Sequence, residues 1–140
     1  MISKIESQAD VSGLIDIFTE VWGAETLSEF ISSIQSTECI LAKNDKGEVI
    51  GYAFYGIDER EDFLEITDVG VGLACRGAGY GHELVCYICS LHPCVRLTVK
   101  EGNPAKYLYE KNGFQIIQTY QNYYGVRQDG LRVEFKAKMS

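Results

Sequence analysis

The stretch Arg76-Gly77-Ala78-Gly79-Tyr80-Gly81 separates two segments of different periodicity. The apolar residues 64–73 before it are typical of a strand, and residues 79–91 after it carry apolar side chains at helical spacing. Glycines let the backbone approach a ligand closely, and the first turn of a helix leaves unpaired amides that attract negative charge. The stretch therefore predicts a pyrophosphate-binding loop, with a tight strand-to-helix turn without a ligand as the alternative.

The composition is that of an ordinary globular protein. The chain has 140 residues, of which 46% are hydrophobic, and a formal net charge of −7. This length predicts a single domain over residues 1–140. The acidic balance argues against a nucleic-acid partner, which would require a basic face. No apolar run is long enough to span a membrane and the N-terminus does not resemble a secretion signal, so we expect a cytoplasmic protein without a membrane partner.

The five cysteines are an odd number, and without a secretion signal we expect them to be reduced thiols. A metal site is the sharper interpretation of one group of residues that share a helical spacing, His82, Cys86, Cys89 and His92. Ten residues of helix rise about 15 Å, however, whereas zinc needs all of its ligands at one point. One straight helix cannot supply all four ligands, and we expect no metal.

The hydrophobic pattern predicts a mixed α/β (α+β) fold with the element order β, α, α, β, β, β, α, β, α, β, β. The expected strands are 2–7, 39–43, 49–57, 63–71, 95–99, 114–124 and 131–137. The expected helices are 11–21, 27–34, 79–91 and a fourth that ends at Asn112-Gly113. This order predicts a mixed sheet with helices on both faces.

Turn and cap residues predict where several elements begin and end. Residues 44–47 form a turn with glycine last, which favours a hairpin. Thr26 and Glu29 match a capping box, and Asn103 suits the N-cap of the fourth helix with Pro104 at its first position. Asp129-Gly130 predicts the loop of a final hairpin.

Two segments carry a resemblance to a known family. Residues 71–81, which contain the glycine-rich stretch, resemble the acetyl-coenzyme A loop of the GNAT superfamily of N-acetyltransferases, whose signature is R/Q-x-x-G-x-G/A. Residues 103–114 are similar to the N-P-A-x-x-L-Y-E-x-x-G-F segment of many small bacterial members. The element order matches this family over nearly the whole chain. The resemblance implies a mostly antiparallel central sheet of about seven strands, helices on both faces, and acetyl-CoA as cosubstrate.

The resemblance also implies which residues contact acetyl-CoA. Backbone groups of Val69 and Val71 would pair with the pantetheine arm. Amides of the glycine-rich loop would bind the pyrophosphate, and the residues concerned are Arg76, Gly77, Ala78, Gly79, Tyr80 and Gly81. The Arg76 side chain would brace the loop or meet phosphate, and Asn103 completes the cofactor-binding set. One departure is Gly72-Leu73-Ala74, where the family often has a proline-containing turn.

The chemistry requires an unprotonated amine and a proton for the departing thiolate. Tyr109 is the expected acid, because a phenol with a pKa near 10 stays protonated at neutral pH and members of the family hold a tyrosine at this place. Glu65 and Asp68 lie on the strand that borders the substrate, and either is a candidate base. Their side chains should face opposite sides of that strand. We favour Glu65. The alternatives are a carboxylate that only binds a cation or is solvated at the end of the sheet, and deprotonation of the amine through water without a dedicated side chain.

Substrate choice should come from the first two helices. Phe18, Trp22 and Phe30 are candidate pocket walls, and Glu20 or Glu25 is a candidate ammonium partner; core packing is the alternative for the aromatic residues. The segment 120–124 would supply aromatic walls or a homodimer contact.

The predicted function is an acetyl-CoA-dependent N-acetyltransferase that acts on a primary amine of a small molecule by direct attack in a ternary complex. The alternatives are a protein or peptide N-acetyltransferase and an acyl-CoA-binding regulatory or partner-binding module without turnover. A dinucleotide or P-loop site does not fit, since His82 breaks the G-x-G-x-x-G spacing and no G-K-[ST] follows.

Overall fold

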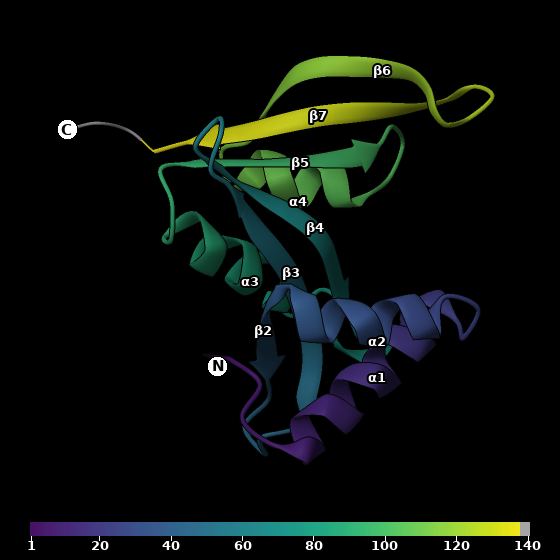
Figure 1. Ribbon diagram of the computed structural model, residues 1–140, viewed down its shortest axis with the longest axis vertical. Coiled ribbons are helices and arrows are strands. Elements are labelled where there is room, and N and C mark those ends of the chain that lie inside the picture. Colours follow the sequence, from purple (N-terminus) through teal and green to yellow (C-terminus); the bar gives the residue numbers. More distant parts are fainter. Residues whose placement is uncertain (138–140) are drawn as a thin grey trace. The chain divides into compact units, whose positions relative to one another are not determined.

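The computed structural model describes residues 1–137 as a seven-stranded mixed sheet with helices (Figure 1). The strands are β1 (Ile2–Ser3), β2 (Glu38–Lys43), β3 (Val49–Asp58), β4 (Phe63–Val71), β5 (Cys94–Lys100), β6 (Gln115–Gly125) and β7 (Gln128–Lys136). The helices are α1 (Gln8–Trp22), α2 (Leu27–Ser36), α3 (Tyr80–Cys89), α4 (Ala105–Lys111) and the short 3-10 helix η1 (Leu73–Cys75). The predicted element order is confirmed, with η1 in addition. None of the helices in the described residues is long and apolar enough to cross a membrane.

The strands hydrogen bond in the order β1-β2-β3-β4-β5-β7-β6. Pairs β1–β2, β2–β3, β5–β7 and β6–β7 are antiparallel, and β4–β5 is parallel, with Leu64 opposite Val95 and Glu65 opposite Arg96. The mostly antiparallel mixed sheet is therefore as predicted. The described residues form two compact units: unit 1 comprises residues 1–56 with 68–84, and unit 2 comprises residues 57–67 with 85–137.

Unit 1 has helices on both faces of its strands. On one face α1 and α2 pack over β2 and β3 (Figure 1) through a buried cluster whose members are Leu14, Phe18, Phe30, Cys39, Leu41, Tyr52 and Phe54. On the opposite face Leu84 of α3 lies against Gly51, where an added Cβ would be 3.4 Å from the leucine Cδ1. Gly51 and Tyr52 are neighbours on one strand and so face opposite sides, which confirms the prediction of helices on both faces.

Helix α1 is anchored at both ends. At its start Asp10 forms a buried ion pair with Lys43 of β2, with Nζ 3.0 Å from Oδ1, and also accepts a hydrogen bond from the Glu6 amide at 2.9 Å. At its end Gly23 has φ 81°, a conformation that a residue with a side chain rarely adopts, and its amide donates to the Thr19 carbonyl. The last turn of α1, which carries Glu20 and Trp22, is therefore held in place by the helix as a whole.

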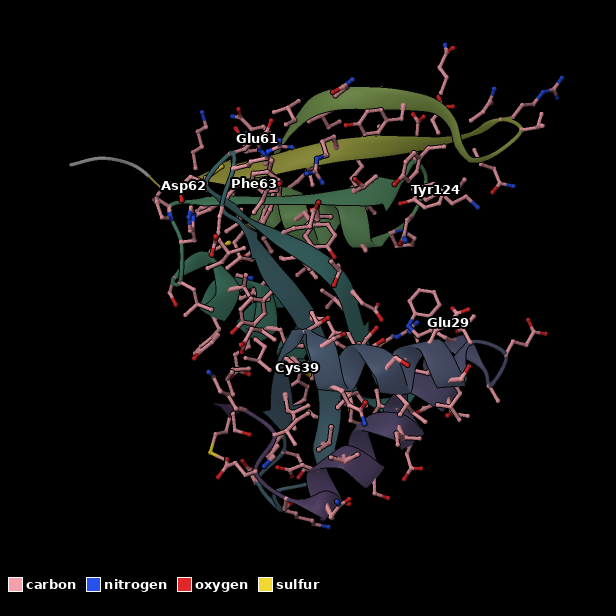
Figure 2. All side chains as sticks on the ribbon, viewed as in Figure 1. Glu29, Cys39, Glu61, Asp62, Phe63 and Tyr124 are labelled. Atoms are coloured by element: carbon pink, nitrogen blue, oxygen red, sulfur yellow. The ribbon has the colours of Figure 1, made fainter. Side chains whose placement is uncertain are left out.

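Unit 2 is a sheet with one apolar and one ionic face. Val95, Leu97 and Val99 alternate along β5 and are buried, as predicted. The other face carries Arg96, whose Nε donates to Glu134 Oε2 at 2.7 Å and whose guanidinium lies 4.3 Å from the centre of the Phe63 ring. Figure 2 shows Phe63 beside Glu61 and Asp62, at the start of β4.

Two predicted turn features are wrong. Thr26 precedes α2 with φ −107° and ψ 19° and makes no side-chain cap, because its backbone is not in the extended conformation that aims a cap side chain at the first amides. The Asp129-Gly130 pair lies within β7 and not in the hairpin loop; Asp129 Oδ1 accepts from the Asn122 amide at 3.0 Å across the hairpin. The loop comes earlier, between paired Gly125 and Gln128.

Candidate active site

The glycine-rich loop of unit 1 links η1 to α3. Gly77 and Gly79 have φ 82° and 92°, and a Cβ added at either position would meet no atom within 4 Å. Both glycines are therefore required for conformation, and the backbone beside them is open. The Gly79 carbonyl accepts from the Glu83 amide at 3.0 Å, so α3 starts directly from the loop. An open backbone at a helix start fits a phosphate group.

The approach to this loop is braced from two sides. Arg76 Nε donates to the Val71 carbonyl at 3.2 Å, which fits the bracing role among the two roles considered for Arg76. The Leu73 amide donates to Glu20 Oε1 at 3.1 Å, so this carboxylate of α1 contacts the loop. A proline would have no amide to donate at this position. Glu20 thus ties η1 to α1 at the place where the chain departs from the family pattern.

A chain of hydrogen bonds joins three side chains in unit 1. Trp22 Nε1 donates to the Tyr52 hydroxyl at 2.9 Å, and that hydroxyl donates to Asp68 Oδ2 at 2.9 Å. The three residues come from α1, β3 and β4. Tyr52 has no exposed surface, whereas Trp22 is 56% exposed. The chain therefore runs from a solvent-facing indole to a half-buried carboxylate.

The surroundings of Asp68 favour its neutral form. Burial raises the pKa of the Asp68 carboxyl above its ordinary value, although hydrogen bonds from Tyr52 and from the Val69 amide oppose this rise. Burial and the Asp68 charge also raise the pKa of the Tyr52 phenol and raise that of the Cys39 thiol to about 12. Both neighbours are neutral at physiological pH, and the pKa of Asp68 is shifted in the direction that a general base requires.

Glu65 has a different environment, in unit 2. Its Oε2 accepts from Arg132 Nη1 at 2.7 Å, and the same guanidinium nitrogen is 3.3 Å from Thr98 Oγ1. Glu65 therefore already binds a cation within the protein, the Arg132 guanidinium. These contacts match the cation-binding alternative for Glu65, and its role as the base stays a prediction.

The residues predicted from the second motif lie in unit 2. Tyr109 of α4 is buried, and its ring meets that of Phe114 edge-on with centroids 5.6 Å apart. Asn103 Oδ1 accepts from the Ala105 amide at 2.9 Å, but α4 begins at Ala105 and Pro104 occupies the cap position, one residue later than predicted. The predicted C-terminus at Asn112-Gly113 is confirmed, with Gly113 at φ 90°. The acid role of Tyr109 and the cofactor role of Asn103 stay predictions.

The three predicted pocket walls do not share one environment. Phe18 and Phe30 are 5% and 4% exposed and stack on each other with centroids 3.8 Å apart, so core packing accounts for them. Trp22 alone presents its ring to solvent. Tyr124, in the tail segment of unit 2 (Figure 2), is half exposed and its hydroxyl is 3.3 Å from the Thr98 carbonyl. A dimer contact there stays a prediction.

Sequence reasoning missed Tyr52 and Gly70. Tyr52 lies within an apolar strand, where a tyrosine resembles any other core aromatic. Gly70 lies beneath its ring: a Cβ there would be 2.5 Å from Tyr52 Cε1. The sequence signal for this contact is the glycine two residues after Asp68. A glycine within a strand leaves room for an aromatic ring on its face of β4, and residues two apart share that face.

The described residues contain no group of three or more His, Cys, Asp or Glu side chains arranged to hold a metal ion. Of the helical set considered for zinc, His92 contacts Asp62 Oδ1 at 3.0 Å and the Cys86 thiol lies 3.1 Å from Asn112 Oδ1.

Comparisons with known proteins agree with this geometry. A search of curated proteins finds no match. Among solved structures, a GNAT-family acetyltransferase from Bacillus cereus ATCC 10987 is similar at 20% identity and a TM-score of 0.83, covering 99% of this chain and 98% of that one. The ribosomal-protein-S18-alanine N-acetyltransferase from Escherichia coli is similar at 18% identity and a TM-score of 0.81, covering 100% and 95%. An aminoglycoside 6'-N-acetyltransferase complexed with coenzyme A is similar at 17% identity and a TM-score of 0.79, covering 100% and 98%. The family model for the acetyltransferase (GNAT) domain matches residues 35–116, more than half of the chain, and the chain therefore belongs to the GNAT family of acetyltransferases.

Proposed function

We propose that this chain, as a single domain, transfers an acetyl group from acetyl-CoA to a primary amine of a small molecule by direct attack in a ternary complex. The observation that carries the proposal is the open glycine-rich loop at the start of α3 in a chain of this family. Similar structures include enzymes named for a protein alanine and for an aminoglycoside, so the family covers both substrate types. The choice of a small molecule as the acceptor is therefore our proposal, and the amine panel described below tests it.

The loop residues 76–81 would hold the pyrophosphate through their backbone amides. Arg76 keeps the loop against the end of β4 through its bond to Val71. Backbone groups of Val69 and Val71 are proposed for the pantetheine arm, although the Val69 amide already donates to Asp68. Acetyl-CoA supplies the acetyl group as a thioester, and the protein supplies position and proton transfer.

We assign the base to Asp68. The incoming ammonium has to lose a proton before it attacks, since alkyl amines have a pKa near 10.4. Asp68 combines a raised pKa with a carboxylate that no cation holds in its described contacts, whereas Glu65 is paired with Arg132. Trp22 is the proposed platform for the ammonium, because an exposed indole ring attracts a cation. Tyr109 is proposed as the acid for the thiolate on the strength of its place in the second motif.

Calorimetric titration with acetyl-CoA, followed by thiol release with an amine panel, tests this proposal. The panel comprises phenethylamine, putrescine, kanamycin and a peptide that begins with alanine. We expect micromolar binding and release of CoA with a small amine. Gly79→Asp should abolish binding, because the added carboxylate repels the pyrophosphate and a side chain strains φ 92°. Tyr109→Phe should lower turnover at least about tenfold and leave binding unchanged.

Each outcome has a defined meaning. Binding without thiol release from any amine would favour the acyl-CoA-binding module. Release only with the peptide would replace the small-molecule acceptor by a protein acceptor. Retained affinity in Gly79→Asp would show that the loop is not the pyrophosphate site, and unchanged turnover in Tyr109→Phe would remove that residue as the acid.

A further inference from the structure

The hydrogen-bond chain from Trp22 to Asp68 has a fixed direction. An indole N–H can only donate, so the Tyr52 oxygen is the acceptor in the 2.9 Å contact with Trp22. A phenol has a single proton, and the second 2.9 Å contact directs that proton to Asp68 Oδ2. Asp68 therefore receives a donated hydrogen bond at Oδ2. Within the described residues both protons of this chain point toward Asp68, the indole N–H to Tyr52 and the phenol O–H to Asp68, so the chain donates to Asp68 and does not lead a proton away from it.

Packing holds the middle member of this chain in one orientation. Tyr52 is fully buried, and its ring lies edge-on to Phe30 with centroids 5.5 Å apart. Phe54 is a second neighbour, also with centroids 5.5 Å apart. Gly70 provides the space beneath the ring, since a Cβ there would be 2.9 Å from the Tyr52 hydroxyl oxygen. The position of the phenol oxygen is thus set by the core of unit 1.

We propose that Tyr52 and Trp22 are positioning residues that hold the Asp68 carboxylate in the orientation and ionised state in which it accepts the proton of the acceptor amine. The inference rests on the proposed function, in which Asp68 is the base. Tyr52 acts on Asp68 directly, and Trp22 acts through Tyr52 by occupying the oxygen that could otherwise accept a hydrogen bond from elsewhere. The exposed indole, which we propose as the platform for the ammonium, is thereby connected to Asp68 through Tyr52.

The proton step balances without a further reagent. The N–H bond of the ammonium breaks, its electron pair stays on nitrogen, and an O–H bond forms on Asp68. The neutral amine is then the nucleophile, and Asp68 returns its proton to solvent after the acetyl group has moved. The titratable groups that face Asp68 are Tyr52 of β3 and Cys39 of β2, and both stay protonated through this cycle.

Loss of the Tyr52 hydrogen bond should move the pH profile of kcat/KM in one direction only. The Tyr52 hydrogen bond favours the charged form of Asp68 and so lowers the pKa of that carboxyl. When the bond is removed by Tyr52→Phe, the pKa rises further. The acidic limb of the kcat/KM profile should then move to higher pH, and kcat should fall about tenfold, because orientation supplies part of the base's contribution. Trp22→Phe keeps an aromatic ring but removes the indole N–H. It should also move the acidic limb to higher pH, by less than Tyr52→Phe does.

A spectroscopic measurement tests the chain independently of turnover. Trp22 is the single tryptophan of the sequence, so intrinsic indole fluorescence reports on this site alone. We expect an acid transition in the fluorescence of the folded wild type, with folding checked by circular dichroism. Asp68→Asn and Tyr52→Phe should abolish it. Tyr87→Phe, which removes a phenol hydroxyl from α3, is the matched control and should leave both the transition and the pH profile unchanged.

The outcomes separate this inference from the proposed function. If wild type turns over and Tyr52→Phe keeps its kcat and its acidic limb, the positioning role is wrong and Asp68 can still be the base. If the fluorescence transition persists in folded Tyr52→Phe, the chain does not couple Trp22 to Asp68. If the wild type binds no acetyl-CoA and releases no thiol, the proposed function fails, and the catalytic use of the chain fails with it. The inference is supported if Tyr52→Phe loses the fluorescence transition and its acidic kcat/KM limb moves to higher pH, while its acetyl-CoA affinity is unchanged.

Discussion

Two carboxylates three residues apart on β4, Glu65 and Asp68, have different partners. Asp68 is half buried and contacts the neutral hydroxyl of Tyr52, whereas Glu65 contacts the guanidinium of Arg132. Burial raises the pKa of the Asp68 carboxyl, whereas the Glu65 carboxylate is already engaged in an ion pair. A proton acceptor that works near neutral pH needs a raised carboxyl pKa.

Substituting each carboxylate by its amide therefore tests which one is the base. Asp68→Asn should lower kcat by about a hundredfold or more, because general-base catalysis is lost while the amide keeps an acceptor for Tyr52. Glu65→Gln should cost only a little stability, since the ion pair with Arg132 is partly exposed. Steady-state kinetics and thermal melts of both variants provide the comparison. The reverse pattern, with kcat lost only in Glu65→Gln, would restore Glu65 as the base.

At the scale of elements, α1 serves both proposed binding regions of unit 1. Its last turn carries Trp22, which contacts Tyr52, and Glu20, which contacts the amide of η1. Gly72, at the start of η1, packs against the same helix: a Cβ there would be 3.1 Å from Ile17 Cδ1. One helix thus contacts both the side chain that holds the proposed base and the start of the proposed pyrophosphate loop.

Removal of the Glu20 carboxylate should weaken cofactor binding. Glu20→Ala leaves the Leu73 amide to water and should raise the acetyl-CoA dissociation constant by about fivefold, the equivalent of one hydrogen bond. Glu20→Gln retains a carbonyl acceptor and should stay near wild type. Asp16→Ala, an exposed acid one turn earlier in α1, is the matched control. Equal calorimetric affinities for Glu20→Ala and this control would show that the contact does not organise the loop.

At the scale of the molecule, the two units are joined by shared elements. The unit boundaries fall after residues 56, 67 and 84, within β3, β4 and α3. A strand or helix that is cut at its middle loses backbone hydrogen bonds on both sides of the cut. We therefore expect the units to unfold together, as the proposed single domain requires.

Denaturant unfolding should give one transition. The fluorescence of Trp22 reports on unit 1, and far-ultraviolet circular dichroism reports on the helices and strands of both units. The two curves should coincide in midpoint and slope. Saturating acetyl-CoA should shift both midpoints to higher denaturant concentration, because at a hundredfold excess over the dissociation constant it raises the free energy of unfolding by about 2.7 kcal/mol. A fluorescence midpoint that differs from the dichroism midpoint would instead indicate two domains.

The sequence by itself determined the family, the element order and the place of the glycine-rich loop. These follow from local information: periodicity assigns a strand or a helix, and glycines at 77 and 79 are needed for positive φ in any surroundings. Asn112-Gly113 as a helix end and residues 44–47 as a hairpin turn are local in the same sense. The Thr26 prediction is wrong because the backbone there is not extended, and the Asp129-Gly130 prediction is wrong because this pair lies within β7, where Asp129 bonds the Asn122 amide across the hairpin.

Only the tertiary structure shows the different surroundings of the two carboxylates, on which our proposal of Asp68 as the base rests. Alternation along β4 predicts that Glu65 and Asp68 face opposite sides of the strand, but it does not predict which residues each side chain contacts. Arg132 of β7 contacts Glu65, and Tyr52 of β3 contacts Asp68. Contacts between residues that are far apart in the sequence produce no local sequence pattern from which they could be predicted. These contacts decide that Glu65 is ion-paired and that Asp68 is half buried, and this burial raises the pKa of Asp68. The motifs that indicate the type of chemistry are therefore local in the sequence, whereas the surroundings of the residue that we propose as the base are set by packing.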